Sequence, residues 1–473
     1  MRFVVVALLS RQLFGGIYQP RHIVTRRLMA TATESASSSS SRPSANRICG
    51  EHLVRCHPDE YESLLAVKVK NMRDLVSDAM PMTRTMEPDI FRSPKEHFRM
   101  RANFNVWRDQ PKDDTAQGMY YAMFDKELVE EDASKKSKNA RGVPCEVKHY
   151  PHGTKKINTL MTQWLEALQE HPVLCSSLFE ARFLTTQTDD AVIVVCYKKP
   201  LTDEWQVAAD AVAAKLQVKI VGRSRKLKLV AGGGETVEEV LNVHGRSIKY
   251  YQQEGAFSQP NAQVCEKMLE WSMDATAGSA DQDLLELYCG GGTFTAALSA
   301  NFRRVLATEM SKASVELAHK AFQANHIENI KIARLSSEEF TEAWEGKRPF
   351  VRLVEAGIKF DEYKFSTVFV DPPRAGMDAL TCALCARFDK IVYISCNPVT
   401  LARDLKILGE THDAVRTACF DQFPYSHHLE SGVLLVKRQV VGDKRKAEGE
   451  AEAETETEAA ATTDEGEKKA KTS

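Results

Sequence analysis

Residues 256–438 alternate short apolar runs with helical patterns, and this alternation constrains the fold more than any other feature of the chain. Such alternation is typical of a doubly wound sheet. Four of the apolar runs end in a glycine loop, an acid or a cysteine, and open α/β sheets bind ligands at the carboxyl ends of their strands. A last apolar run, 432–436, is expected to close the sheet. The sequence therefore predicts an α/β fold with a ligand site along one sheet edge.

One of these runs, 392–395, stops at Cys396, which is followed by Asn-Pro. A strand that ends at such a turn presents its last side chain at the sheet edge, where a nucleophilic thiol would be useful. The alternative is a buried cysteine that packs as a small hydrophobe. Three further strand ends favour the nucleophile.

Those three strand ends carry groups that suit a nucleotide-like ligand. The run 283–288 leads into the glycine triplet 290–292, and glycine lets the backbone approach a ligand closely. The next strand ends in Glu309, about twenty residues on, where an acid can bind two ribose hydroxyls. Another ends in Asp371, followed by Pro-Pro-Arg. Each has a structural alternative, namely a tight turn, a solvated acid or a helix start, but four together argue against coincidence.

Together these segments resemble the RNA uracil-5 methyltransferases, and within them the tRNA-modifying branch that uses S-adenosylmethionine. The resemblance covers nearly all of residues 50–438. It rests on these motifs: F-R-S-P (91–94), R-M-R-A (99–102), Trp107, S-Q-P-N (258–261), L-L-E-L-Y-C-G (284–290), V-L-A-T-E (305–309), V-D-P-P-R (370–374), I-S-C-N-P (394–398) and D-Q-F-P-Y-S-H-H-L-E-S-G (421–432).

The resemblance implies a C-terminal doubly wound class I methyltransferase domain, Rossmann-like, at 256–438, and a mixed α/β RNA-binding region at 46–255. It also implies the site residues. Cys396 would be the nucleophile and Glu430 the base. The residues that would contact S-adenosylmethionine are Gln259, Tyr288, Thr293, Glu309 and Asp371. The family commonly has Asn where this chain has Gly291 and Thr293, so a hydroxyl stands in for one amide.

The implied chemistry explains why these groups are needed. A thiolate that adds to C6 of uracil makes C5 nucleophilic, and a base must then remove the C5 proton. A free cysteine is only roughly 3% ionised at pH 7, so Arg374, if it lies nearby, would favour the thiolate. We expect His427 and His428 to have supporting roles, although either could be a second base.

The target base must be flipped out of an RNA loop, and aromatic side chains commonly receive such bases. The candidates, each of which could instead be a core residue, are Phe98, Phe179, Phe423 and Tyr425. The net charge of −2 does not announce a nucleic-acid partner, so RNA binding must depend on local patches. Two candidate patches are the segment 223–228 and a set of arginines interleaved with aromatics: Arg92, Arg99 and Arg101, with Phe91, Phe98 and Phe104.

The two ends of the chain differ from the rest. Residues 1–45 hold six Arg and one acid and include a serine run, which is the composition of a transit peptide. We therefore expect a mitochondrial protein, with the cytosol or nucleus as alternatives. Residues 439–473 are a charged, low-complexity tail that should be disordered. No stretch reaches the about eighteen apolar residues of a membrane span.

The eleven cysteines have no disulfide spacing, which suits a reducing compartment. Cys382 and Cys385 form a C-x-x-C with no second pair, and we interpret them as packing residues. The ribosomal-RNA branch of the family carries an iron–sulfur cluster on clustered N-terminal cysteines, whereas those of this chain are scattered. We therefore expect no metal cluster.

The sequence thus predicts a monomeric, S-adenosylmethionine-dependent enzyme that methylates C5 of the T-loop uridine of tRNA and contacts no membrane. A ribosomal-RNA uracil-5 methyltransferase and a tRNA-folding protein are the alternatives. A nicotinamide oxidoreductase is disfavoured because Thr295 stands where the dinucleotide fingerprint has its third glycine.

Overall fold

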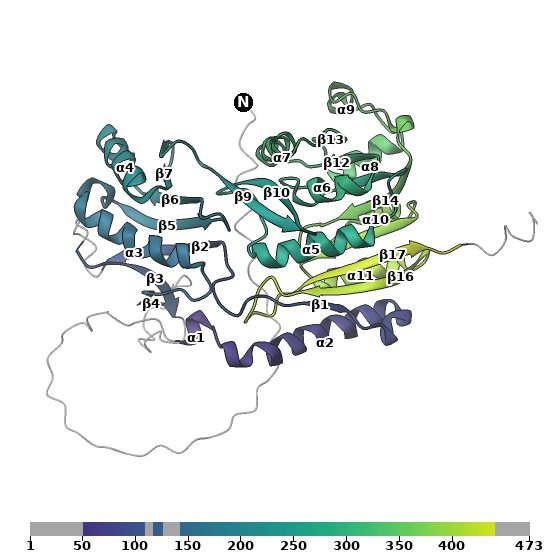
Figure 1. Cartoon of the computed structure of the whole chain (residues 1–473), viewed down its shortest axis with the longest axis horizontal. Helices are drawn as coiled ribbons and strands as arrows, with labels where there is room; N and C mark the ends of the chain where they lie inside the picture. The colour runs from purple at the N-terminus through teal and green to yellow at the C-terminus, as the bar shows by residue number, and fades with distance from the viewer. Residues whose placement is uncertain (1–50, 109–116, 126–141, 440–473) are drawn as a thin grey trace, which may run out of the picture. The chain divides into compact units, whose positions relative to one another are not determined.

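The computed structural model describes residues 51–108, 117–125 and 142–439, all within one compact unit (Figure 1). The segment 1–45 and, apart from residue 439, the tail 439–473 lie outside the described residues.

The C-terminal part forms an eight-stranded sheet in the order β1-β16-β17-β15-β14-β11-β12-β13. The strands from β11 to β15 are parallel, and β17 runs antiparallel between β15 and β16. This sheet confirms the predicted doubly wound, Rossmann-like fold. Its strands are β1 (Asp89–Phe91), β11 (Asp283–Leu287), β12 (Arg304–Thr308), β13 (Ile330–Ala333), β14 (Phe365–Val370), β15 (Lys390–Ser395), β16 (His412–Phe420) and β17 (Glu430–Lys437).

Helices cover both faces of this sheet because its central strands are apolar on both sides. Within β11, Leu285 and Leu287 face one core and Leu284 faces the other, as the alternation of side chains along a strand requires. The helices of the first core are α2 (Tyr61–Ala79), α8 (Ser337–Trp344), α9 (Val351–Glu355), α10 (Ala379–Cys385) and α11 (Pro398–Leu408). The helices of the second core are α5 (Ala262–Ala275), α6 (Thr293–Leu298) and α7 (Lys312–Ala324).

Residues 61–91 pack with the C-terminal sheet, although most of the N-terminal region separates them from it in the sequence. The helix α2 packs along α11, and β1 pairs in parallel with β16 at the edge of the sheet (Figure 1). Leu65, Met72 and Val76 of α2 are buried in the first core. The sequence did not indicate that residues 61–91 would pack with the C-terminal sheet.

The N-terminal region forms a seven-stranded, mostly antiparallel sheet in the order β4-β3-β2-β5-β6-β7-β8. Its strands are β2 (Arg101–Arg108), β3 (Met119–Asp125), β4 (Val143–Glu146), β5 (Leu178–Thr185), β6 (Ala191–Tyr197), β7 (Lys219–Arg223) and β8 (Lys228–Ala231). The helices α3 (Lys155–Glu170) and α4 (Asp203–Leu216) share one core with it. Trp164 of α3 and the uniformly buried strand β6 contribute to this core.

A hairpin of β9 (Thr236–Val243) and β10 (Arg246–Gln253) follows the seven-stranded sheet. Leu241 and Tyr250 pack in the second core of the C-terminal sheet. The hydroxyl of Tyr250 donates to the carbonyl of Thr293, 2.9 Å away, at the first residue of α6. The hairpin therefore supports the helix that follows the glycine loop, and its chain continues directly to Gln259.

Candidate active site

The predicted strand ends meet at one edge of the eight-stranded sheet. The register aligns Leu287 with Val370 and Val370 with Tyr393, so the chain leaves β11, β14 and β15 side by side. A cavity of about 680 Å³ lies at this edge. All seven predicted site residues line it: Gln259, Tyr288, Thr293, Glu309, Asp371, Cys396 and Glu430.

The glycine loop is held by Glu309. One carboxylate oxygen accepts the N–H of Gly290 at 3.0 Å, and the other accepts the N–H of Ser311 at 2.7 Å. Gly292 has a φ of +76°, and a Cβ there would lie 2.8 Å from the ring of Phe322, so only glycine fits. A Cβ at Gly290 or at Gly291 would meet nothing within 4 Å, which means that the loop faces open space.

Gln259 and Asp371 face each other across the cavity wall. The amide nitrogen of Gln259 lies 3.5 Å from the carboxylate of Asp371, at the limit of a hydrogen bond. The amide oxygen of Gln259 is buried and accepts no hydrogen bond from the described residues. Burial raises the pKa of Asp371 to about 7. These two residues thus offer a free acceptor and an anion that is costly to keep without a cationic partner.

Tyr288, with a φ of +63°, lines the cavity, and its hydroxyl hydrogen-bonds with Ser337, 2.6 Å away on α8. Thr293 lies at the start of α6, where helix N–H groups are unpaired within the helix.

Cys396 follows the last residue of β15, and Glu430 is the first residue of the neighbouring strand β17. The antiparallel register pairs Ile394 with Gly432 and Ser395 with Ser431. Cys396 and Glu430 come one position beyond this last pair, and the carboxylate of Glu430 is near enough to raise the pKa of Cys396. Both residues line the cavity.

The pKa of Cys396 differs from the expectation that Arg374 would favour the thiolate. Burial raises the pKa of the thiol to about 12, with further increases from the carboxylates of Glu430 and Asp371. Arg374 lowers this pKa, as expected, but does not outweigh the other effects. Burial, and then Asp371, hold the pKa of Glu430 well above its ordinary range. Burial and the neighbouring carboxylates therefore disfavour the charged forms of both Cys396 and Glu430.

Of the two adjacent histidines, His427 and His428, it is His428 that lines the cavity. Its Nδ1 lies 3.0 Å from Nη2 of Arg374, which donates, so the imidazole accepts and is neutral. Burial, then His427 and Arg374, lower the pKa of His428 to about 4. His427 instead lines an adjoining groove of about 640 Å³. Phe423 and His428 line both spaces, so they form the rim between the groove and the cavity.

The four aromatic candidates for base stacking separate by their surroundings. Phe98 is buried in the core, and Tyr425 is buried and stacked on His152. Phe179 is exposed on β5 and does not line the cavity. Only Phe423 of the four lines the cavity.

Sequence reasoning missed Phe257, Ser311 and Ser314, which also line the cavity. Phe257 is 67% exposed, which is unusual for a large apolar side chain and places its ring where a ligand can reach it. Its position two residues before Gln259 was the available signal. The serines follow Glu309, and their backbone geometry at the start of α7 gives no sequence pattern of its own.

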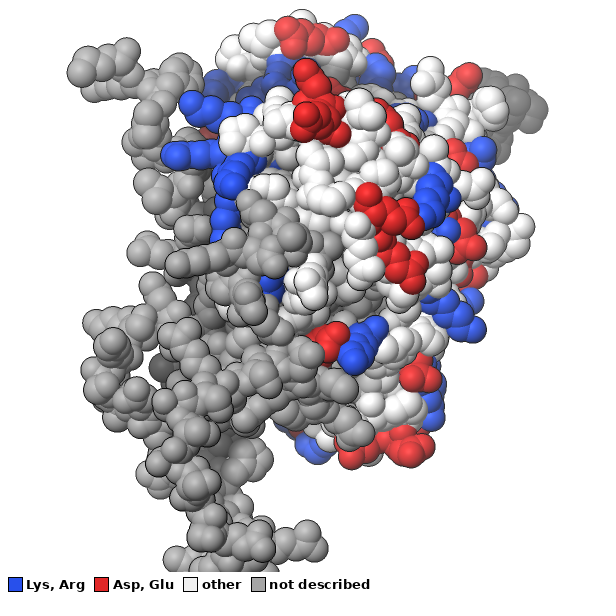
Figure 2. All heavy atoms as spheres, turned by 90° about the vertical axis from the view of Figure 1, so that its left-hand side faces the viewer, with Lys and Arg blue, Asp and Glu red and all other residues white. Residues whose placement is uncertain are grey.

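Three of the seven basic residues in the two predicted RNA patches are paired with acids. Arg223 pairs with Glu254 at 3.2 Å, and Lys228 pairs with Glu235 at 2.8 Å. Arg225 and Lys226 are exposed at the turn between β7 and β8. The arginines of the second patch are also engaged: Arg92 with Glu62, Arg99 with the carbonyl of Arg101, and Arg101 with Ser258. On the face drawn in Figure 2, basic side chains gather at the upper left, and basic and acidic side chains are interspersed on the right.

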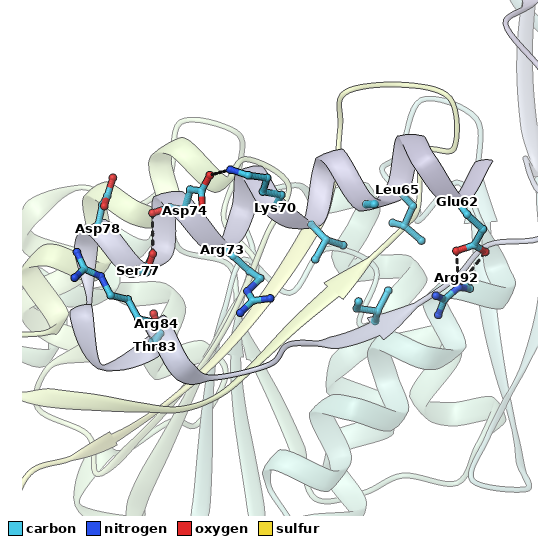
Figure 3. A pocket seen from close by; sticks show the side chains of 13 residues that line it. Glu62, Leu65, Lys70, Arg73, Asp74, Ser77, Asp78, Thr83, Arg84 and Arg92 are labelled. Atoms are coloured by element: carbon cyan, nitrogen blue, oxygen red, sulfur yellow. Dashed lines mark hydrogen bonds and ion pairs between the residues drawn. The ribbon is translucent and has the colours of Figure 1, made fainter. Parts of the chain in front are cut away.

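A larger hollow of about 910 Å³ lies along α2, away from the strand ends (Figure 3). Two of its three arginines are paired with acids: Arg73 with Glu87 at 2.8 Å and Arg92 with Glu62 at 3.1 Å. It brings together no thiol, histidine or unpaired buried acid. The smaller cavity at the strand ends is therefore the candidate active site.

The cavity residues fit S-adenosylmethionine. The free amide oxygen of Gln259, the open glycine loop and the acids Glu309 and Asp371 together suit a ligand that carries a nucleoside, an ammonium and a positively charged sulfonium. A volume of about 680 Å³ is ample for such a ligand. No group of three or more His, Cys, Asp or Glu within the described residues has the geometry of a metal site, and no helix there is long and apolar enough to cross a membrane.

The fold and the site are those of a class I methyltransferase whose cavity fits S-adenosylmethionine. The model of the tRNA (uracil-5-)-methyltransferase family matches residues 60–438. The chain belongs to this family, and the protein is accordingly a tRNA uracil-5 methyltransferase.

Individual relatives agree with this assignment. The tRNA/tmRNA (uracil-C(5))-methyltransferase of Acinetobacter baylyi is 50% identical over 375 residues, which are 79% of this chain and 98% of that protein. The enzyme of the same name from Azotobacter vinelandii is 47% identical over 382 residues, 80% of this chain and 98% of that protein. The structure of Pyrococcus abyssi tRNA (uracil-54, C5)-methyltransferase with S-adenosyl-L-homocysteine has a TM-score of 0.57 at 19% identity, over 80% of this chain and 83% of that one, and so shares the fold.

The prediction of a mitochondrial protein is wrong, because the relatives from Acinetobacter and Azotobacter are tRNA methyltransferases of bacteria. The prediction rested on the composition of residues 1–45, which lie outside the described residues. A basic, serine-rich composition indicates that a segment lacks a hydrophobic core, and it does not by itself specify import.

Proposed function

We propose that the protein methylates C5 of the T-loop uridine of tRNA through a covalent bond between Cys396 and C6 of the base. The bacterial relatives are named for the uracil-C5 reaction, and the Pyrococcus protein is named for uracil 54. Support for the covalent step comes from the neighbouring strands β15 and β17, because Cys396 follows the end of one, Glu430 begins the other, and both line the donor cavity.

The two residues divide the chemistry. Bound S-adenosylmethionine supplies an electrophilic methyl group on a positively charged sulfur. The thiolate of Cys396 adds to C6 of the uracil, and the electron pair of the C5–C6 double bond moves toward O4, so that C5 becomes nucleophilic. After C5 has gained the methyl group, Glu430 removes the C5 proton, the C5–C6 double bond re-forms and the Cys396–C6 bond breaks.

The raised pKa values suit these roles. A carboxylate with a high pKa is a strong base, and Glu430 must take a proton from carbon. A thiol with a pKa of about 12 is nearly inert until positive charge enters the site, which limits side reactions at Cys396. Arg374 is placed to stabilise the thiolate, since it already lowers the pKa of Cys396.

We propose further that the region 46–255 contributes to RNA binding and that Phe423 contacts the flipped base. Its ring stands at the rim that joins the groove to the cavity. Arg225 and Lys226 are exposed and suit phosphate contacts.

Transfer of labelled methyl from S-adenosylmethionine to RNA transcripts tests this function. We expect 5-methyluridine at position 54 of tRNA, the position named for the Pyrococcus protein, and no label when that uridine is replaced by cytidine. Ribosomal RNA is included as a competing substrate. Methylation at another tRNA uridine, or preference for ribosomal RNA, would contradict the proposed specificity.

A further inference from the structure

A buried lysine from α2 contacts the loop that carries the rim of the active site. Residues 421–429 connect β16 to β17 and include Phe423 and His428. Nζ of Lys68 donates to the carboxylate of Asp421, to the carbonyl of Phe423 at 3.1 Å and to the carbonyl of His428 at 3.2 Å. An ammonium has three N–H donors, so all of them are used within this one loop.

Lys68 and Asp421 are both almost entirely buried, with 7% and 1% of their surfaces exposed. Burial of either charge alone would be costly, and each compensates the other. The backbone N–H of Asp421 also donates to the carbonyl of Phe91, 3.0 Å away, at the end of β1. An apolar pair of the same size could fill this space at lower cost, so the ionic pair points to a requirement for geometry.

We propose that Lys68 is a positioning residue that holds the loop 421–429 in its active conformation. Its two carbonyl contacts lie at the two rim residues, Phe423 and His428, and the loop leads directly into Glu430. The inference rests on the proposed function, because it assigns these residues to the reacting side of the cavity.

The contacts of Lys68 involve the rim at Phe423 and His428, whereas the glycine loop and Glu309 on the donor side have contacts of their own. His428 accepts a hydrogen bond from Arg374, which in turn lowers the pKa of Cys396. Release of the loop therefore changes the surroundings of the thiol and the rim. The glycine loop and Glu309 come from β11 and β12 and are held by their own hydrogen bonds. Loss of Lys68 should impair methyl transfer and leave donor binding intact.

The test compares three variants of the full chain with the wild type. Lys68→Met removes the ammonium, and Lys68→Met/Asp421→Asn also removes the uncompensated charge, so that folding is preserved. Lys70→Met is the matched control, because Lys70 lies on the same helix with 75% of its side chain exposed. Single-turnover methyl transfer to tRNA, affinity for S-adenosylhomocysteine and hydrogen exchange of residues 421–429 are measured for each.

We expect both Lys68 variants to transfer methyl at least about 30-fold more slowly, with affinity for S-adenosylhomocysteine within about threefold of the wild type. Their hydrogen exchange should rise in residues 421–429, and Lys70→Met should match the wild type. Wild-type rates and exchange in the double variant would overturn the proposal, as would an equal loss of donor affinity. Failure of the wild type to methylate tRNA would refute the proposed function, while the exchange measurement would still decide the role of Lys68.

Discussion

Alkylation of Cys396 tests the electrostatic account of the site without any RNA. The structure raises the pKa of this thiol to about 12, compared with about 8.5 for free cysteine. Below pH 8 the thiolate is then about 3,000-fold scarcer than for a free thiol. Each thiolate is roughly 30-fold more reactive because nucleophilicity rises with pKa. We expect iodoacetamide to modify Cys396 about 100-fold more slowly than N-acetylcysteine at pH 7.5, as followed by peptide mass spectrometry.

The pH profile separates this effect from poor access. The rate at Cys396 should still rise about tenfold per pH unit between pH 8 and 10, whereas that of a free thiol levels off near its pKa of about 8.5. Asp371→Asn removes a carboxylate that raises the pKa of Cys396, so this variant should react faster; Asp361→Asn, at an exposed position, is the control. A plateau below pH 9 in the wild type would refute the reasoning.

Three further perturbations follow from the cavity. Glu309→Gln should weaken S-adenosylhomocysteine binding about tenfold by calorimetry, or about 1.4 kcal/mol, with tRNA affinity unchanged; equal losses would indicate a folding defect. Gly292→Ala should lower the free energy of unfolding in urea by about 2–4 kcal/mol, because the added Cβ would overlap Phe322. Gly291→Asn, the control, should change it by less than about 0.5 kcal/mol, because a Cβ there meets nothing. Similar values for both would contradict the loop geometry. Phe423→Ala should raise the KM for tRNA about fivefold or more, as loss of a base stack of about 1–3 kcal/mol requires, and an unchanged KM would remove Phe423 from the RNA site.

The strand ends could be predicted because they depend on local signals and one general rule. Each of β11, β12, β14 and β15 is a short apolar run that stops at a turn, and parallel strands place such ends at one edge. The position of Glu430 near Cys396 depends on the antiparallel insertion of β17 beside β15, for which the sequence gives only the family resemblance.

The pKa of Cys396 could not be predicted because its causes are distant in the sequence. Arg374 was visible in the motif with Asp371, but the sequence did not show that burial and two carboxylates would outweigh it. The ion pairs within the basic patches could not be predicted for the same reason. Arg223 pairs with Glu254 and Arg92 with Glu62, about 30 residues away in each case, and such pairing depends on the folded chain.

The short strand β1 and its contacts with β16 were also out of reach of the sequence. Three residues, Asp89–Phe91, are too few to establish a period of two. Their place is fixed by packing instead: Phe91 stacks on Phe420, with ring centroids 4.9 Å apart, and Arg416 pairs with Asp89 at 2.7 Å. These contacts bring α2, and with it Lys68, to the active-site loop.

The most direct test of the central claim is a denaturing gel of the Glu430→Gln variant after incubation with tRNA and S-adenosylmethionine. The thiol of this variant can still add to C6 and C5 can still gain the methyl group, but the C5 proton has no base, so the protein should remain bonded to RNA and migrate slowly. Cys396→Ala/Glu430→Gln should give no such band, and Cys396→Ala should not methylate tRNA. A band that persists without Cys396 would contradict the assigned nucleophile, and full turnover by Glu430→Gln would contradict the assigned base.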